Sequence, residues 1–328
     1  MPTEVFSLRL WRSSGFSRPS ALELLLFAPI SLFARAIYKL LNLLHSSPRK
    51  PTHPIRVVCI SDTHTIIPSD IPYGDILIHA GDLTIHGTLS ELQAHIDWLH
   101  SLPHPHKIAI AGNHDTYLDA RSRRTLKPSD CDGELNWGTI HYLQHEEITL
   151  HFPGHGKRSL RIYGAPQIPA CGGPEFAFQY RRGQDAWSGT VPAGVDVLVT
   201  HTPAKGHLDN LRPGLGCEWL LKEMWRTRPR LHVCAHVHDG WGREVVSWDG
   251  GQSVYEDLIC RDERRGVVAA WIDVEGWVGL VRLLVEGGRG LVWDRVWGGG
   301  RKTTVMVNAA LTIANKKKLR KEVQVVDI

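Results

Sequence analysis

Five short polar clusters recur along this 328-residue chain, and each follows an apolar run rich in valine, isoleucine and leucine. The runs are short and lack the alternation of a half-exposed strand, so they predict buried strands of one sheet. They cover residues 55–60, 75–80, 107–111, 195–199 and 231–235. The clusters are Asp62-Thr63-His64, Gly81-Asp82, Gly112-Asn113-His114-Asp115, Thr200-His201-Thr202-Pro203 and His236-Val237-His238.

The clusters can meet in space although they are far apart in the sequence. In open α/β sheets, the loops at the carboxyl ends of the strands converge on one crevice. Asp62 and His64 are two residues apart, as are His236 and His238, so each pair can point the same way from an extended segment. We therefore expect an α/β fold in which these side chains form a single site.

The side chains on offer are Asp, Asn and His, a set that suits Mn, Fe, Zn or Ni better than thiolate-binding ions. Two such cations held about 3.5 to 4 Å apart need a carboxylate between them. Asp82 is the candidate for this bridge. Gly81 and Gly112 would let the backbone approach the ions without a Cβ in the way.

In this order the clusters resemble the signature of the calcineurin-like metallophosphoesterases, which is Asp-x-His, Gly-Asp, Gly-Asn-His-(Glu/Asp), His and Gly-His-x-His. The resemblance implies a four-layer α-β-β-α sandwich with its metal site at the carboxyl ends of the strands. One departure is Ala235, where the family usually has Gly; it could tighten a turn but removes no ligand.

The resemblance also implies a role for each site residue. One metal would be held by Asp62, His64 and His238, and the other by Asn113, His201 and His236, with Asp82 shared. His114 would be the acid that protonates the leaving oxygen, and Asp115 would orient its ring. The nucleophile would be a hydroxide that bridges the two metal ions.

Three further segments point to a branch of this superfamily. Residues 78–84, 164–166 and 200–209 resemble class III cyclic-nucleotide phosphodiesterases and the brain metallophosphoesterase-domain proteins. This resemblance covers residues 55–257 and a last strand near 303–310, and it favours a small phosphodiester substrate such as a cyclic nucleotide.

Two alternatives to a phosphodiesterase remain open. A phosphomonoesterase acting on proteins or small molecules is the nearest, but the protein phosphatases of this type carry an Arg in an extended Gly-Asp-x-x-x-Arg-Gly motif. Here Gly81-Asp82 is followed by Leu-Thr-Ile-His-Gly, which lacks that bidentate phosphate clamp. The other alternative is a non-catalytic nucleotide-binding or scaffold protein that keeps the fold.

Charge and cysteine content set limits on partners and compartment. The net charge of +4 is too mild to predict a nucleic-acid-binding face. The six cysteines show no Cys-x-x-Cys spacing, which fits a reducing, cytoplasmic location.

We expect a domain from residue 55 to 310, with an extension at each end. Residues 1–54 would hold an apolar segment, 22–44, and a Pro-rich linker. An interfacial or core-docked amphipathic helix, with peripheral membrane contact, is preferred for this segment over a spanning anchor, because Arg35 would lie near the centre of a span. Arg9, Arg12 and Arg18 keep an organelle presequence open. Residues 311–328 would form a basic tail.

Four local patterns complete the prediction. Residues 90–93 have capping-box spacing before a helix with Leu92, Ile96 and Leu99 on one face, and residues 218–228 predict another helix ended by Pro229. Residues 258–300, rich in Trp and Gly, predict an atypical insertion that packs on the domain. Phe176, Phe178 and Tyr180 alternate, which favours a half-buried strand over a base-stacking surface.

Overall fold

The computed structural model describes residues 20–45, 51–209, 214–261, 266–297, 302–313, 316–319 and 321–328. The chain divides into two compact units. The larger, which we call the sheet unit, comprises residues 49–209, 215–246 and 303–328, and the smaller, the helical unit, comprises residues 1–48, 210–214 and 247–302.

The first sheet of the sheet unit has five strands in the order β15-β1-β2-β3-β4. Strands β1 to β4 are parallel, and β15 pairs antiparallel with β1. The strands are β1 (Arg56–Ile60), β2 (Ile76–Ala80), β3 (His106–Ile110), β4 (His141–Tyr142) and β15 (Gln324–Asp327).

The second sheet has six strands in the order β11-β12-β10-β9-β6-β5. Its central strands β12, β10, β9 and β6 are parallel, and β5 pairs antiparallel with β6. The strands are β5 (Glu146–Phe152), β6 (Arg158–Ala165), β9 (Val197–Thr200), β10 (Leu231–Cys234), β11 (Gly242–Ser247) and β12 (Thr303–Asn308). The five apolar runs are therefore all strands, divided between two sheets rather than placed in one.

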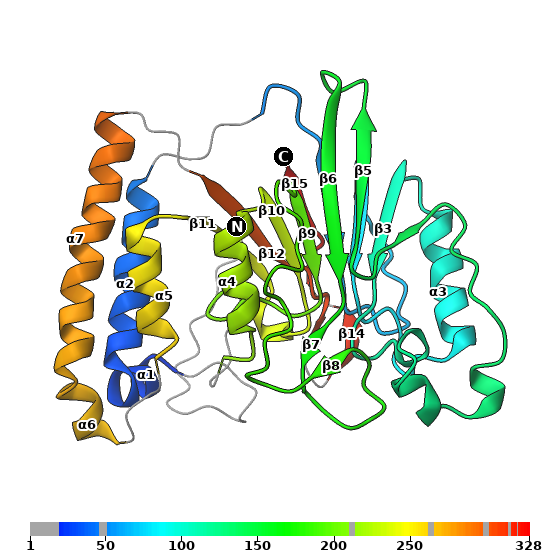
Figure 1. The fold of residues 1–328 in the computed structure, drawn as a ribbon, viewed down its shortest axis with the longest axis horizontal. Coiled ribbons are helices and arrows are strands. Elements are labelled where there is room, and N and C mark those ends of the chain that lie inside the picture. Colours follow the sequence, from blue (N-terminus) through cyan, green and yellow to red (C-terminus); the bar gives the residue numbers. More distant parts are fainter. Residues whose placement is uncertain are drawn as a thin grey trace. The chain divides into compact units, whose positions relative to one another are not determined.

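Alternate residues of the two sheets face each other and form one apolar core. Val57 and Ile78 of the first sheet share this core with Ile162, Val199 and Val233 of the second, all fully buried. Figure 1 shows the helices α3 (Leu89–Ser101) and α4 (Glu218–Thr227) on opposite sides of the paired sheets. The predicted α/β class and α-β-β-α layering are confirmed.

The two predicted helices form, with one change at the start of α3. Leu92, Ile96 and Leu99 are buried against the first sheet, as predicted. The N-cap, however, is Thr88, whose hydroxyl accepts from the amide of Glu91, so the cap lies two residues before the predicted Ser90. Helix α4 ends at Thr227, and its C-cap Arg228 adopts a left-handed conformation just before Pro229.

Short elements complete the sheet unit. They connect the strands and place loops at the carboxyl edge of the sheets. They are the 3-10 turns η1 (Thr116–Leu118), η2 (Ser122–Thr125), η3 (Pro128–Asp130) and η4 (His238–Gly240), and the strand pairs β7 (Ile168–Pro169) with β8 (Gln179–Tyr180) and β13 (Thr312–Ile313) with β14 (Lys316–Leu319).

The C-terminal residues do not form a separate tail. Strand β15 pairs with β1, and the last residue, Ile328, exchanges backbone hydrogen bonds with Ile55. Val326 and Ile328 are buried in the core between the sheets. Because the apolar residues after the lysine-rich segment join the core, strand β15 belongs to the sheet unit. The prediction of a basic tail outside the domain is corrected.

The helical unit contains α1 (Ala21–Phe27), α2 (Pro29–Leu44), α5 (Gly250–Ile259), α6 (Val267–Trp271) and α7 (Val274–Val296). Ile30 and Ala34 of α2 share a small core with Leu258 of α5 and Leu283 of α7. Residues 22–44 thus form two helices with a buried face, separated at Ala28, which precedes Pro29, the first residue of α2. The predicted presequence arginines lie outside the described residues.

Because of its glycines, the sequence of residues 258–300 does not predict helices. Gly251 faces the backbone of Gly287, and a Cβ on Gly287 would lie 2.3 Å from a methyl carbon of Leu41. These small residues let α2, α5 and α7 approach closely, and that packing outweighs the low helix propensity of glycine. The segment predicted as an insertion therefore contributes helices to the helical unit, which is separate from the sheet unit. No helix in the described ranges has both the length and the hydropathy needed to cross a membrane.

Candidate metal centre

The predicted ligands lie in loops at the carboxyl ends of strands from both sheets. Asp62 follows β1, Asp82 follows β2, Asn113 follows β3, His201 follows β9 and His236 follows β10. Four ligands adopt left-handed backbone conformations that non-glycine residues avoid: Asp62, His64, Asp82 and His236 have φ between 47° and 63°. Such conformations cost roughly 1 to 2 kcal/mol each, and they concentrate at functional sites.

Two glycines allow the loops to converge. A Cβ on Gly81 would lie 2.6 Å from Nδ1 of His201, and a Cβ on Gly112 would lie 2.2 Å from Oδ1 of Asp82. Both contacts are far too short for any side chain, so glycine is required at both positions. This agrees with the role that the sequence predicted for them.

The first group of ligands consists of Asp62, His64 and His238, whose ligand atoms all lie within 4.8 Å of one another. Nε2 of His238 is 3.0 Å from Oδ1 of Asp62, and the amide of His236 donates to the other carboxylate oxygen of Asp62 over 3.3 Å. The backbone oxygen of Asp62 accepts a hydrogen bond from the hydroxyl of Thr312. Asp62 is thereby held from the side chain and the backbone.

The second group consists of Asp82, His201 and His236, with Asn113 beside them. Nδ1 of His201 is 2.8 Å from the carbonyl oxygen of Ala80 and must donate its proton there. Its Nε2 then faces Oδ1 of Asn113 at 3.1 Å and Oδ1 of Asp82 at 3.4 Å. Three electron-pair donors meet at this point.

The donor set fits a cation. Without one, the charge of Asp82 raises the pKa of His201 to about 9 despite the opposing effect of burial, and the ring keeps a proton at Nε2. A divalent cation would replace that proton, as is usual when metals bind ionisable ligands. Asp82 belongs to this group and also to a third one with His64 and His114, so it lies where a ligand shared by two ions would be.

The two carboxylates are ionised in the folded chain. Burial is the largest single influence and raises both pKa values, but the combined effect of the neighbouring histidines lowers both below the usual range. His238 contributes most at Asp62, and His201 contributes most at Asp82. Burial and the neighbouring His201 lower the pKa of His236 to about 3, so this ring is neutral and can bind a metal. The site therefore presents anionic oxygens and a neutral imidazole before any ion arrives.

His114 lies beside these ligands, but Asp115 does not orient its ring. Nδ1 of His114 donates to the carbonyl oxygen of Ile85 over 2.9 Å, and that contact fixes the ring. The carboxylate of Asp115 instead accepts hydrogen bonds from the amides of Leu83, Thr84 and Gly112 and from the Thr84 hydroxyl. The predicted orienting role of Asp115 is corrected: this carboxylate ties the Asp82 loop to the Asn113 loop.

Sequence reasoning missed one neighbour of the site. The ring of Phe176 lies 4.9 Å from that of His114 and is half-buried. Its loop is attached to the site, because Ala177 donates its amide to the carbonyl oxygen of Asn113. The alternation of Phe176 with Phe178 predicts only a half-buried strand. That pattern holds no signal for a contact with a residue more than sixty positions away.

Comparisons with known proteins identify the family of this chain. The Calcineurin-like phosphoesterase family matches residues 55–240, which include all seven predicted ligands and His114. The chain belongs to the calcineurin-like phosphoesterase family. Metallophosphoesterase domain-containing protein 1 of Homo sapiens is 38% identical to this family member over 239 residues, which are 66% of this chain and 69% of the human protein. A UPF0046 protein of Caenorhabditis elegans is 35% identical over 245 residues, covering 66% of this chain and 58% of that protein.

A third relative is much longer than this calcineurin-like phosphoesterase. It is a protein of Emericella nidulans named "Probable rhamnogalacturonate lyase C", 39% identical over 277 residues. The match covers 84% of this chain but only 24% of that protein. The chain thus spans about a quarter of this relative's length, and the activity in the relative's name is stated of that protein alone.

Proposed function

We propose that this protein is a dinuclear metal-dependent phosphodiesterase that acts on a small phosphodiester such as a cyclic nucleotide. Three groups of possible metal ligands share members, and this overlap is the main support for the proposal. The group of His64, Asp82 and His114 shares His64 with the first group and Asp82 with the second. When bound, two cations would polarise the phosphoryl oxygens and lower the pKa of a water held between them.

The residues of the chain supply the remaining chemistry. Asp62, His64 and His238 would hold one cation and Asn113, His201 and His236 the other, with Asp82 shared. Because Nδ1 of His114 donates to the carbonyl oxygen of Ile85, a proton for the leaving oxygen would be carried at Nε2. The ring is half-exposed at the edge of the ligand cluster, where a substrate can reach it.

The lack of an arginine in the segment that follows Asp82 supports a diester over a monoester substrate. A monoester carries an additional negative charge, which a bidentate Arg would neutralise. In the segment after Asp82, Ile85 is half-buried and His86 is exposed, and neither can make that contact. A site without this clamp suits a diester, whose phosphate carries a single charge.

The test compares hydrolysis of bis-p-nitrophenyl phosphate with that of p-nitrophenyl phosphate in the presence of Mn. We expect turnover of the diester and little of the monoester. A preference for the monoester would favour a phosphomonoesterase, and no turnover of either by protein with bound metal would favour a non-catalytic scaffold. If the diester is hydrolysed, 2′,3′- and 3′,5′-cyclic nucleotides should be tested next.

A further inference from the structure

Helix α7 is apolar on the side that faces away from its own core. Its inner face holds Leu280 and Leu283, which are buried against α2 and α5. The opposite face has a row of exposed valines spaced three, four or seven residues apart, and this spacing places them along one side of the helix. They are Val274 (72% exposed), Val278 (54%), Val281 (61%), Val285 (54%) and Val292 (49%).

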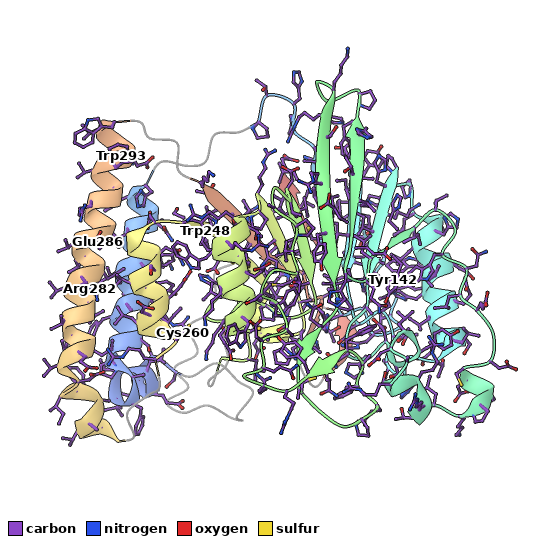
Figure 2. All side chains as sticks on the ribbon, viewed as in Figure 1. Tyr142, Trp248, Cys260, Arg282, Glu286 and Trp293 are labelled. Carbon is purple, nitrogen blue, oxygen red and sulfur yellow. The ribbon has the colours of Figure 1, made fainter. Side chains whose placement is uncertain are left out.

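More exposed apolar side chains lie near both ends of this row. Val268 and Ile272, in and just after α6, are 73% and 68% exposed at one end. At the other end, Trp293 and Trp297 stack on each other, and both are more than half exposed. Figure 2 shows Trp293 near the C-terminal end of α7. Single exposed apolar residues are ordinary, but a set this long indicates an interaction surface. We call it the valine face.

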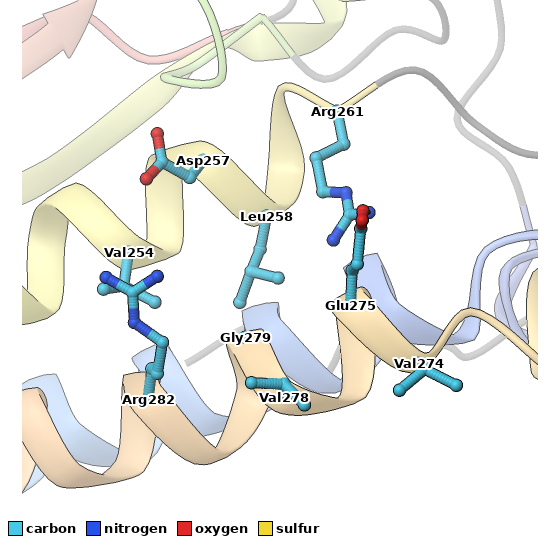
Figure 3. A pocket seen from close by; sticks show the side chains of 9 residues that line it. All are labelled: Val254, Asp257, Leu258, Arg261, Val274, Glu275, Val278, Gly279 and Arg282. Atoms are coloured by element: carbon cyan, nitrogen blue, oxygen red, sulfur yellow. The ribbon is translucent and has the colours of Figure 1, made fainter.

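A cavity of about 460 Å³ borders the valine face between α5 and α7. Val254 and Leu258 of α5 and Val274 and Val278 of α7 give it apolar walls, and Arg261 and Arg282 reach into it (Figure 3). Arg261 pairs with Asp273 and Glu275 at 3.3 and 3.0 Å. Arg282 forms no ion pair with any residue that the structure describes, so its guanidinium can bind an external anion.

We propose that the valine face docks on a phospholipid surface and that Arg282 binds a lipid phosphate there. The valines would enter the outer part of the acyl layer, and the tryptophans would lie at headgroup level, where indole rings are favoured. Helix α7 carries six charged residues, so one side of it, and not its whole circumference, suits lipid. This surface is independent of the proposed hydrolysis.

A second copy of the chain fits this face less well. It could cover the valine row, but on α7 itself no carboxylate remains for the Arg282 of another copy, and the cavity adds only Asp257, which lies on α5 and not on the helix of the valine row. The three acidic residues of α7, Glu275, Glu286 and Asp294, already contact Arg261, Arg289 and His45. A phosphate supplies the missing negative charge and the acyl chains supply the apolar contact, so one lipid surface satisfies both.

The test is co-sedimentation of the full chain with vesicles of phosphatidylcholine alone and of phosphatidylcholine with phosphatidylserine. We expect the protein to bind vesicles, and the double variant Val281→Asp/Val285→Asp to bind at least about tenfold more weakly. Arg282→Gln should weaken binding roughly fivefold. Tyr73→Asp is the matched control, because Tyr73 is 60% exposed and belongs to the sheet unit. Circular dichroism verifies that each variant is folded.

The two vesicle types identify the phosphate. Equal binding to both vesicle types would show that the protein binds the phosphate of any phospholipid. Stronger binding with phosphatidylserine would show that it prefers anionic headgroups. Failure of the native chain to bind either vesicle, or equal binding by the double valine variant, would overturn the proposal. A lipid-free dimer, seen by light scattering and dissociated by the double variant, would assign the face to a second copy instead.

Discussion

At the scale of single residues, the site depends on contacts that only one side chain can make. Gly112 leaves room for the Asp82 carboxylate, and the His201 ring is fixed by the carbonyl oxygen of Ala80. Left-handed backbone at Asp62, Asp82 and His236 turns the ligands toward one another. The strain in these loops is compensated by the strands below them, where every residue of β2 and of β10 is buried.

Gly112→Ala should abolish metal binding. The new Cβ would lie 2.2 Å from Oδ1 of Asp82, and the carboxylate that both ions would share must then move. We expect metal content, measured by inductively coupled plasma mass spectrometry, to fall to background while the far-ultraviolet circular dichroism is kept. Gly154→Ala is the control, because nothing lies within 4 Å of its added Cβ. Normal metal content in Gly112→Ala would show that Asp82 need not stay in place.

His114→Ala should separate catalysis from metal binding. The ring hydrogen-bonds to Ile85 and contacts Phe176 rather than holding the backbone of the metal ligands. Loss of a general acid lowers turnover by about 10² to 10⁴, most strongly for poor leaving groups. We expect slow hydrolysis of alkyl diesters with unchanged metal content. An unchanged rate for a poor leaving group would remove His114 from the role of acid.

Acid should destabilise the metal-free protein through its buried neutral histidines. Burial, assisted by His207, lowers the pKa of His232 to about 3, whereas the unfolded side chain titrates near 6.5. Between these values the unfolded chain binds the extra proton, so the free energy of unfolding falls as the pH drops below about 6.5. At pH 5 the loss from His232 alone would be roughly 2 kcal/mol.

His232→Leu tests this directly. Urea denaturation in the presence of a chelator, at pH 7 and pH 5, should show a smaller loss of stability for the variant than for the native chain. Parallel losses for the two proteins would mean that His232 does not titrate in this range. Its hydrogen bond to the Thr200 hydroxyl, at 2.8 Å, is a constant contribution that affects both pH values alike.

At the scale of elements, the positions of the strands in the chain were easier to predict from the sequence than their partners in each sheet. The five apolar runs identify β1, β2, β3, β9 and β10, because buried parallel strands leave a clear signal in composition. Nothing in those runs shows that β1 to β3 belong to one sheet and β9 and β10 to another. Helix α7 was missed for a related reason: its glycines are explained by neighbours such as Leu41 and Leu258, which lie far away in the sequence.

Val326→Ala tests whether β15 is an integral strand. Val326 is 6% exposed in the core between the sheets, and removing its two methyl groups should lower the free energy of unfolding by roughly 2 kcal/mol. Asp327→Ala is the neighbouring control, since its exposed carboxylate only pairs with Arg56 over 3.3 Å. If both substitutions have equal and small effects in urea denaturation, these residues belong to a peripheral tail and not to the core.

At the scale of the whole molecule, the sequence was sufficient to predict the ligand cluster but not the helical unit. All seven predicted ligands lie in one place because the carboxyl ends of parallel strands impose it, so motif order was enough to predict the cluster. The valine face has no motif, and its exposure is set by the packing of three helices. The role of Asp115 could not be read from the sequence either, since it depends on which amides the folded loops bring to its carboxylate.

We infer that these side chains hold a pair of cations around Asp82. Anomalous X-ray diffraction from crystals soaked in Mn can locate both ions. We expect two peaks about 3.5 to 4 Å apart, with the Asp82 carboxylate between them and His114 beside the pair. A single peak, or two peaks that do not share Asp82, would contradict this inference.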